Sequence, residues 1–370
     1  MHTVLLPALI NGVIDGVTLF LVAVGLNLIF GVMGVLNVAH GSFYAIVAAH
    51  MKTVSWETVA APVLVVVFAT LPTLVPTLAD PLTIVLGLGL SALAVGLLMR
   101  AGLISFGHAL YYAVGAYAVA YAARWHVTND VVPLLAIAAV AAGVTAALVA
   151  LFIVRYRGVF FAMLNLALAM VAYALLLKLY RLTGGSDGLP VSAWSIIGVA
   201  LSPAAFSRAF FYLVLAIALA AGVLLARYLD SPSGWALGAA ASSEIRIEYL
   251  GLSTRRVLIA AYVISGVLTG VGGAIAAIDV GHVVPELSYW TTSSEFLFVA
   301  ILGGSGTVVG PFAGAFVYEW LSLFGAQYLA NGWNLLLGLL IIGTLRLAPG
   351  GLWGLLQPRR RMVARERHAA

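Results

Sequence analysis

The residues that could do chemistry in this sequence are few, and their spacing fits neither a catalytic nor a metal centre. The GGSGT stretch from Gly303 to Thr307 could be mistaken for a phosphate-binding loop, but it lacks the lysine that such a loop needs. His40 and His108 belong to no HExxH pattern, and the chain contains no cysteine. No pairing of a nucleophile with a base can be inferred. We therefore expect no enzyme activity, no cofactor and no metal.

Polar residues gather at one place, directly before a long apolar run. Glu244 and Glu248 lie on a segment that we expect to be helical and to end at Gly251, because glycine commonly follows a helix C-terminus. Arg255 and Arg256 come next, and arginines mark the cytoplasmic end of a membrane span. Such charges are also usual in a solvated amphipathic loop. The order of helix, glycine, arginines and span is nevertheless typical of a cytoplasmic docking element.

The composition decides the fold class. The chain has 370 residues, of which 63% are hydrophobic and 8% are charged, and its mean hydropathy is +1.11. A soluble domain has about 25% charged residues, so we predict an all-α, polytopic integral membrane protein with about 9–10 membrane segments, some broken or half-spanning. The 39 glycines suit close helix packing in lipid. The net charge of +5 comes mainly from arginines in short loops and at the C-terminus, and it does not indicate nucleic-acid binding.

The apolar runs give the positions of these segments. They are Val4–Phe30, Gly31–His50, Val59–Leu78, Pro81–Met99, Arg100–Tyr121, Val131–Val154, Gly158–Tyr180, a span ending at Arg227, Val257–Ala277, the half-length Glu295–Leu302, Ile301–Leu321 and Trp333–Leu345.

Two of these segments repeat each other. LNVAHGSFYAIVA around His40 matches ISFGHALYYAVGA around His108, and internal repeats are common in transporters. A histidine within a span faces the bundle interior, so both residues could line a pathway. A hydrogen-bonded structural histidine at a helix break is the other interpretation. The arginine positions place these two similar segments in opposite orientations, and the sequence does not resolve this conflict.

Four motifs carry a resemblance to a known family. The Glu244–Gly251 segment is similar to the cytoplasmic coupling loop of ABC importer permeases. Arg157-Gly158 with the aromatic residues that follow, the Thr183–Gly188 loop, and the glycine motif that runs from Gly303 to Pro311 resemble the permease subunits of branched-chain amino acid importers. That group also includes permeases for urea and short amides.

The resemblance divides the chain unequally. Residues 1–51 resemble the start of one permease subunit, and residues from about 58 onward resemble the other. We therefore expect a truncated N-terminal segment (1–51), a transmembrane permease domain (52–357) with its coupling loop at about 233–256, and a basic cytoplasmic tail (358–370). The chain departs from the family at Met170, where an acid or amide is usual, and ahead of Glu244, where arginines are usual.

The resemblance also implies roles for single residues. The ATPase-docking residues would be Glu244, Ile245, Glu248, Leu250 and Gly251. The translocation path would use His40, His108, Asn165, Gly303, Gly304 and Thr307, with packing an equal alternative for the glycines, which we expect to join two half-helices at mid-bilayer. Thr183, Ser186 and Asp187 would lie at the outer mouth, where Asp187 could equally cap a turn.

The functional expectation is a permease subunit of an ABC importer in the inner membrane of a prokaryote. It would act on branched-chain or other hydrophobic amino acids. By resemblance, its partners would be a second permease subunit, two ATP-binding subunits, a periplasmic or surface substrate-binding protein and membrane lipid. The alternatives are a urea or short-amide permease, an ATP-independent channel or secondary transporter, and an inactive fusion. A secondary transporter usually needs intramembrane charges, which are scarce here.

Overall fold

The computed structural model describes residues 65–66, 68–193, 195–242, 244–249, 251–328, 333–348 and 350–356. The predicted N-terminal segment 1–51 with His40, as well as Leu250 and the tail 358–370, lie outside these residues. Residues 65–66 and 68–74 are helical. The helices that follow are η1 (Pro76–Leu78), α3 (Ala79–Met99), α4 (His108–Arg124), α5 (Val131–Ile153), α6 (Gly158–Lys178), α7 (Tyr180–Thr183), η2 (Gly185–Asp187), α8 (Pro203–Leu229), α9 (Pro232–Ala240), α10 (Glu244–Tyr249), α11 (Thr254–Val280), η3 (Pro285–Ser288), α12 (Trp290–Gly303), α13 (Gly310–Tyr328), α14 (Trp333–Leu347) and α15 (Gly351–Leu356).

Four two-residue strands complete the described part of the chain. β1 (Leu189–Pro190) pairs antiparallel with β4 (His282–Val283), and β2 (Ser195–Ile196) pairs antiparallel with β3 (Val199–Ala200). Everything else of regular structure is helical, which confirms the all-α prediction. Among the described residues, five helices are long and apolar enough to cross a membrane: the helix from Pro76 to Met99, α5, α6, α8 and α11.

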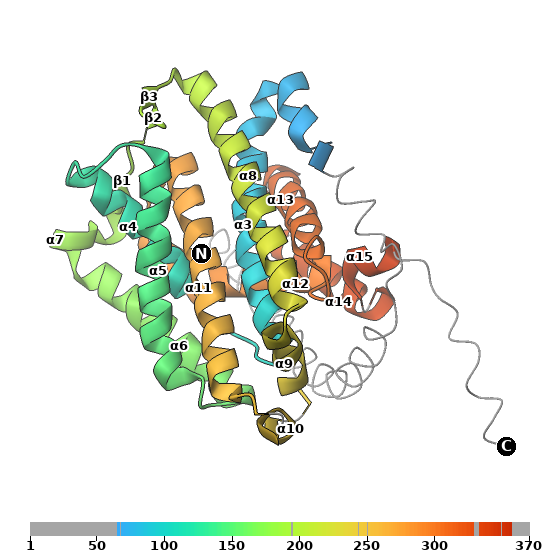
Figure 1. The fold of residues 1–370 in the computed structure, drawn as a ribbon. Helices are drawn as coiled ribbons and strands as arrows, with labels where there is room; N and C mark the ends of the chain where they lie inside the picture. Colours follow the sequence, from blue (N-terminus) through green and yellow to red (C-terminus); the bar gives the residue numbers. More distant parts are fainter. Residues whose placement is uncertain are drawn as a thin grey trace, which may run out of the picture.

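The helices form one bundle with two distinct ends (Figure 1). We name the lower end in Figure 1 the α10 end, because α9 and α10 lie there together with the loop between α5 and α6. The opposite end, with β2 and β3, is the hairpin end. α3 and α8 start at the hairpin end, where the Ser207 hydroxyl donates to the Asp80 carboxylate.

α3 and α11 form the centre of the bundle, and small residues let their neighbours approach closely. Gly266 and Gly270 of α11 face Ala146 and Ala142 of α5, whose side chains are fully buried. A Cβ added at Gly270 would clash with the Cβ of Ala142. Without a hydrophobic driving force between helices in lipid, such close packing is the main source of association. These glycines therefore allow the close helix packing that the glycine-rich composition predicted.

Two irregular segments interrupt the apolar runs. The segment predicted at Arg100–Tyr121 becomes helical only at His108, and residues 100–107 are irregular but mostly buried. Irregular backbone at membrane depth is tolerated where protein surrounds it. The Ile301–Leu321 run is broken at its glycines, as expected, because α12 ends at Gly303 and α13 begins at Gly310. Apolar composition does not distinguish a buried irregular stretch from a helix, which is why the first of these breaks was not predicted.

The second break lies next to the C-terminal end of α3. Arg100, which follows the last residue of α3, donates to the Gly306 carbonyl at 2.8 Å, and Ser305 lies beside Gly96 in the last turns of α3. The mid-bilayer position expected for the glycines stays a prediction. The break nearer the middle is at His108, which faces Ser265 in the central part of α11.

Candidate functional site

α10 is a six-residue helix at the α10 end, and tertiary contacts hold it in place. A helix this short is unstable in isolation. The Ile247 side chain is only 2% exposed and packs into a cluster with Leu237 and Val257. The helix ends as predicted, since Gly251 has a φ of +81° and its N–H donates to the Glu248 carbonyl at 3.0 Å. α11 begins only a few residues later, so a displacement of α10 acts directly on a central helix.

Two residues of α10, Glu248 and Tyr249, expose their side chains at the surface of the bundle. Glu248 is exposed, and Tyr249 is 87% exposed. Leu252, just after the turn, is partly exposed as well. Of the other predicted docking residues, Leu250 and the Ile245 side chain lie outside the described part of the structure. This end of the bundle therefore presents a short helix with an exposed aromatic residue to whatever lies beyond the membrane.

Glu244 lies at the start of α10 and pairs with Arg157, the residue before α6. The Arg157 Nε donates to one carboxylate oxygen and Nη2 donates to the other at 3.1 Å, so the pair is bidentate. Nη1 of Arg157 donates to the carbonyls of Val154 and Tyr156, the latter at 2.9 Å. The guanidinium therefore joins the α5–α6 loop to α10. The sequence motif that contains Arg157 was recognised, but this partner was not.

His108 lies at the first position of α4 and is fully buried. Its Nδ1 lies 2.8 Å from the Ser105 Oγ, and its Nε2 lies 3.1 Å from the Ser265 Oγ on α11. When the Ser265 hydroxyl donates to the Tyr262 carbonyl at 2.8 Å, it accepts from the histidine. This arrangement favours the neutral tautomer with hydrogen on Nε2, in which the Ser105 hydroxyl donates to Nδ1. Both ring nitrogens are then satisfied within the protein.

A second buried chain of hydrogen bonds crosses three helices next to His108. The Tyr111 hydroxyl of α4 donates to the Tyr262 hydroxyl of α11 at 2.8 Å, and Tyr262 donates to the Oδ1 of Asn165 on α6. The Asn165 Nδ2 donates to the Phe161 carbonyl at 2.8 Å. Both hydroxyl donors and the Asn165 amide nitrogen have an acceptor, as burial at membrane depth favours.

These contacts favour structural roles for two of the predicted path residues. His108 is fully buried and Asn165 is 1% exposed. Each side chain makes its hydrogen bonds to groups of this chain, on its own segment and on α11. The alternative of a structural histidine at a helix break, which the sequence left open, agrees with this geometry.

The glycine stretch packs three chain segments together. Gly303 and Gly304 are buried, and a Cβ at Gly303 would clash with the Gly310 carbonyl. Gly304 has a φ of +103°, and a Cβ there would clash with the Gly350 carbonyl. The Thr307 hydroxyl accepts from the Gly310 N–H at 2.9 Å, at the start of α13. The glycines thus serve close backbone contact, and Thr307 caps the helix that follows.

The predicted mouth residues lie in one loop at the hairpin end. Thr183 is buried, donates to the Leu179 carbonyl at 3.0 Å and accepts from the Gly185 N–H, so it shapes the turn. Ser186 and Asp187 are exposed. The Asp187 carboxylate accepts from the Tyr180 hydroxyl at 2.8 Å, and this hydrogen bond raises the pKa of Tyr180. Asp187 therefore stabilises its own loop and remains accessible at the surface.

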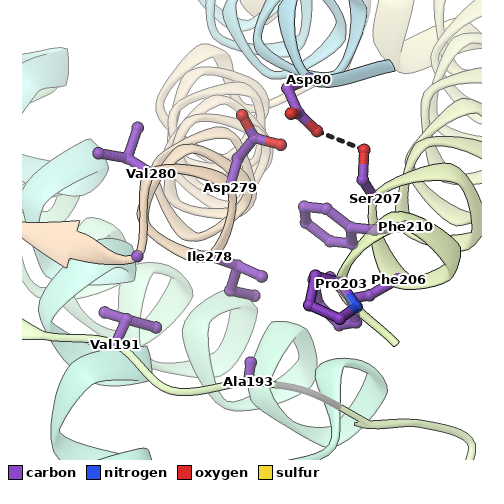
Figure 2. Close-up of a pocket in the computed structure, with 11 residues that line it drawn as sticks. Asp80, Val191, Ala193, Pro203, Phe206, Ser207, Phe210, Ile278, Asp279 and Val280 are labelled. Carbon is purple, nitrogen blue, oxygen red and sulfur yellow. Dashed lines mark hydrogen bonds between the residues drawn. The ribbon is translucent and has the colours of Figure 1, made fainter. Parts of the chain in front are cut away.

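A cavity of about 220 Å³ opens at the same end, between α3, α8 and α11 (Figure 2). Its walls combine apolar side chains, among them Phe206, Phe210 and Ile278, with an about equal share of polar surface. The carboxylates of Asp80 and Asp279 lie along one side, and Ser207 donates to Asp80. Neither carboxylate pairs with a basic residue within the described part of the chain. The sequence analysis missed this pair, because nothing in the sequence brings residues 80 and 279 together.

Basic residues are distributed unevenly between the two ends. Among the described residues, those on segments that meet the α10 end are Arg100, Arg155, Arg157, Arg227, Arg246, Arg255 and Arg256; Arg124, Lys178, Arg181 and Arg208 lie further from it, and Arg346 is in the last turn of α14. By the positive-inside rule, this excess favours a cytoplasmic position for the α10 end.

Comparison with known proteins gives one family for most of the chain. Residues 77–345 match the model of the permease component of the branched-chain amino acid transport system. The matched region runs from η1, just before α3, into the last turn of α14. It therefore includes all the candidate site residues described above.

Individual relatives agree with this match at moderate identity. The chain is 31% identical over 247 residues to the high-affinity branched-chain amino acid transport system permease protein LivM of Escherichia coli (strain K12), which is 60% of this chain and 56% of that protein. It thus spans just over half the length of this relative. It is 24% identical over 351 residues to LivH of Salmonella typhimurium, covering 94% of this chain and 95% of that protein.

A third relative is named for a different transport system. The autoinducer 2 import system permease protein LsrC of Klebsiella pneumoniae is 29% identical over 196 residues, which is 48% of this chain and 54% of that protein. No solved structure matches the chain.

Proposed function

The chain belongs to the family of permease components of branched-chain amino acid transport systems, and from this premise we propose that it is a membrane-embedded permease subunit of an ABC importer. In this role it forms part of the translocation path and hydrolyses nothing itself. Its substrates are branched-chain or other hydrophobic amino acids. The names of the LivM and LivH relatives support this substrate class, and the LsrC relative shows that similar permeases serve other solutes.

The observation that carries the proposal is the arrangement of α10 and α11. α10 lies at the end of the bundle that is rich in arginine, exposes Glu248 and Tyr249, and is followed almost directly by α11. α11 then packs at the bundle centre against α3, α4 and α5. An ATP-binding subunit seated on α10 would therefore transmit its movement along α11 into the membrane.

The partners follow from this role. Two ATP-binding subunits would dock at the cytoplasmic side, one of them on the Glu244–Gly251 segment. A second permease subunit would complete the path, since the predicted path residues His108 and Asn165 are buried inside this chain and offer no lining of their own. A periplasmic or surface substrate-binding protein would deliver substrate at the hairpin end, where Ser186 and Asp187 are exposed. The C-terminus would lie in the cytoplasm.

Co-purification with the ATP-binding subunits tests the docking part of the proposal. The variant Glu248→Arg with Tyr249→Asp changes two exposed side chains, so it should leave the fold intact. Val199→Asp, at an exposed residue of the opposite end, is the matched control. We expect the natural chain and the control to capture the ATP-binding subunits and the double variant to lose them. If the natural chain captures none in the presence of a full-length second permease, the ABC assignment fails, which leaves a stand-alone channel or an inactive fusion.

Uptake measurements decide the substrate class. The complete transporter in proteoliposomes, supplied with its binding protein, should take up leucine in an ATP-dependent manner and should not take up urea. ATP-dependent urea uptake without leucine uptake would identify the urea or short-amide alternative. Uptake that does not depend on ATP would indicate a channel or secondary transporter.

A further inference from the structure

The Glu244 carboxylate is already occupied by a group of its own chain. Both of its oxygens accept hydrogen bonds from Arg157, one from Nε and one from Nη2. In a bidentate contact, two parallel N–H···O bonds join the planar guanidinium to the planar carboxylate. An arginine or lysine of an ATP-binding subunit could reach only the lone pairs that this contact leaves open. The carboxylate therefore serves its own chain first.

Arg157 is itself held by three groups at once. Besides Glu244, it donates to the carbonyls of Val154 and Tyr156, which belong to the loop after α5. Because these carbonyls fix the guanidinium, the position of Glu244 is fixed relative to the ends of α5 and α6. The pair is about one-third exposed on each side, with values of 36% and 38%. Its contribution to overall stability should thus be small.

The remaining contacts of α10 complete a three-point attachment. The Thr254 hydroxyl of α11 donates to the Glu244 carbonyl at 3.4 Å, Ile247 is buried in the bundle, and the Ile247 carbonyl accepts from Leu252 N–H at 3.2 Å after the turn. The first residue of α11 thus holds the start of α10, and the turn before α11 holds its end. The Arg157 pair adds a charged side-chain link from α10 to the α5–α6 loop.

We propose that the Glu244 carboxylate is an internal anchor that orients α10 through Arg157, and that α10 contacts the ATP-binding subunit through Glu248 and Tyr249 instead. Arg157 is then a positioning residue. It ties α6 to α10, so that movement of the docking helix reaches α6 at its base as well as α11. This inference rests on the proposed function for the identity of the partner, but the anchoring itself does not depend on it.

Hydrogen exchange on the purified chain tests the anchoring without any partner. Arg157→Gln should increase the exchange rate of the backbone amides of residues 244–252 by up to about fivefold. Glu244→Ala should do the same. Arg155→Gln is the matched control, because Arg155 lies in the same loop, is exposed, and contacts only the Phe152 ring among its described interactions. Exchange in Arg157→Gln that equals exchange in Arg155→Gln would overturn the proposal.

Capture of ATP-binding subunits tests the division of roles. If Glu244 acts through Arg157, the double variant Arg157→Gln with Glu244→Ala should weaken capture no more than either single variant. If Glu244 has a contact of its own, the two losses should multiply, and the proposal would be wrong. Failure of the natural chain to capture any ATP-binding subunit would reject the proposed function and the role of Glu248 and Tyr249, whereas the exchange result would still decide the anchoring.

Discussion

Tyr262 of α11 donates its hydroxyl hydrogen to the Oδ1 of Asn165 on α6 and accepts the hydroxyl hydrogen of Tyr111 from α4. One side chain thereby connects three helices within the buried part of the bundle. Since α11 follows the docking helix α10, this connection lies on the route by which movement at the α10 end would spread to α4 and α6.

Replacing Tyr262 with phenylalanine should lower stability with little change in packing. Asn165 Oδ1 would lose its donor and the Tyr111 hydroxyl would lose its acceptor, both at fully or almost fully buried positions. The expected loss is about 1 kcal/mol, since hydrogen bonds within membrane proteins average about 0.6 kcal/mol each. Thermal unfolding in detergent measures it. Tyr249→Phe, at an exposed tyrosine, should leave the Tm unchanged, and an equal Tm for both variants would contradict the network.

Gly270→Ala should destabilise the contact between α11 and α5. The added Cβ would clash with the Cβ of Ala142, and overpacking costs about 1–3 kcal/mol. Adding Ala142→Gly to the same chain removes the clashing atom and should restore most of the lost Tm. Gly343→Ala on α14 is the control, because a Cβ there meets nothing within 4 Å and alanine favours the helix. A failure of Ala142→Gly to rescue would show that another contact limits the site.

The sequence was sufficient to predict the long spans and the short helix that ends before Gly251. The spans predicted at Pro81–Met99, Val131–Val154 and Gly158–Tyr180 match α3, α5 and α6 to within two residues. Their length and uniform apolar character dictate this, because helices satisfy their own backbone hydrogen bonds in lipid. Gly251 likewise predicted the end of α10 correctly, since a left-handed turn is a local property of glycine.

The sequence was not sufficient to predict the partners of the polar side chains. Arg157 and Glu244 are 87 residues apart, and His108 and Ser265 are 157 apart. No local pattern encodes such pairs, because they depend on how the helices pack. For the same reason, the path assigned to His108 and Asn165 could not be weighed against a structural role until their neighbours were known. Residues 100–107 were predicted to be helical because a buried irregular segment is as apolar as a helix.

His108 should be found in one neutral tautomer with hydrogen on Nε2. When the Ser265 hydroxyl donates to the Tyr262 carbonyl, it accepts from the ring, which leaves Nδ1 to accept from Ser105. ¹⁵N NMR of the histidine-labelled chain at pH 7.5 measures the tautomer, and His108→Gln identifies the signal among the seven histidines. Signals of hydrogen on Nδ1 would contradict the assignment. Ser265→Ala removes the acceptor and should alter this signal alone.

Asp279→Asn should make the protein more stable at neutral pH. The Asp279 carboxylate lines the same cavity as that of Asp80, and neither pairs with a basic residue within the described ranges. Partial burial and the neighbouring negative charge both disfavour a charged group at this position. Removing the Asp279 carboxylate should therefore increase the free energy of unfolding by about 0.5–2 kcal/mol. Asp80 is the less suitable target because Ser207 donates to it. The Tm in detergent measures the gain. Asp230→Asn, at an exposed aspartate after α8, should change stability by less than about 0.5 kcal/mol. A lower Tm for Asp279→Asn than for the natural chain would mean that the charge at this position is stabilised by a group that neutral asparagine cannot satisfy.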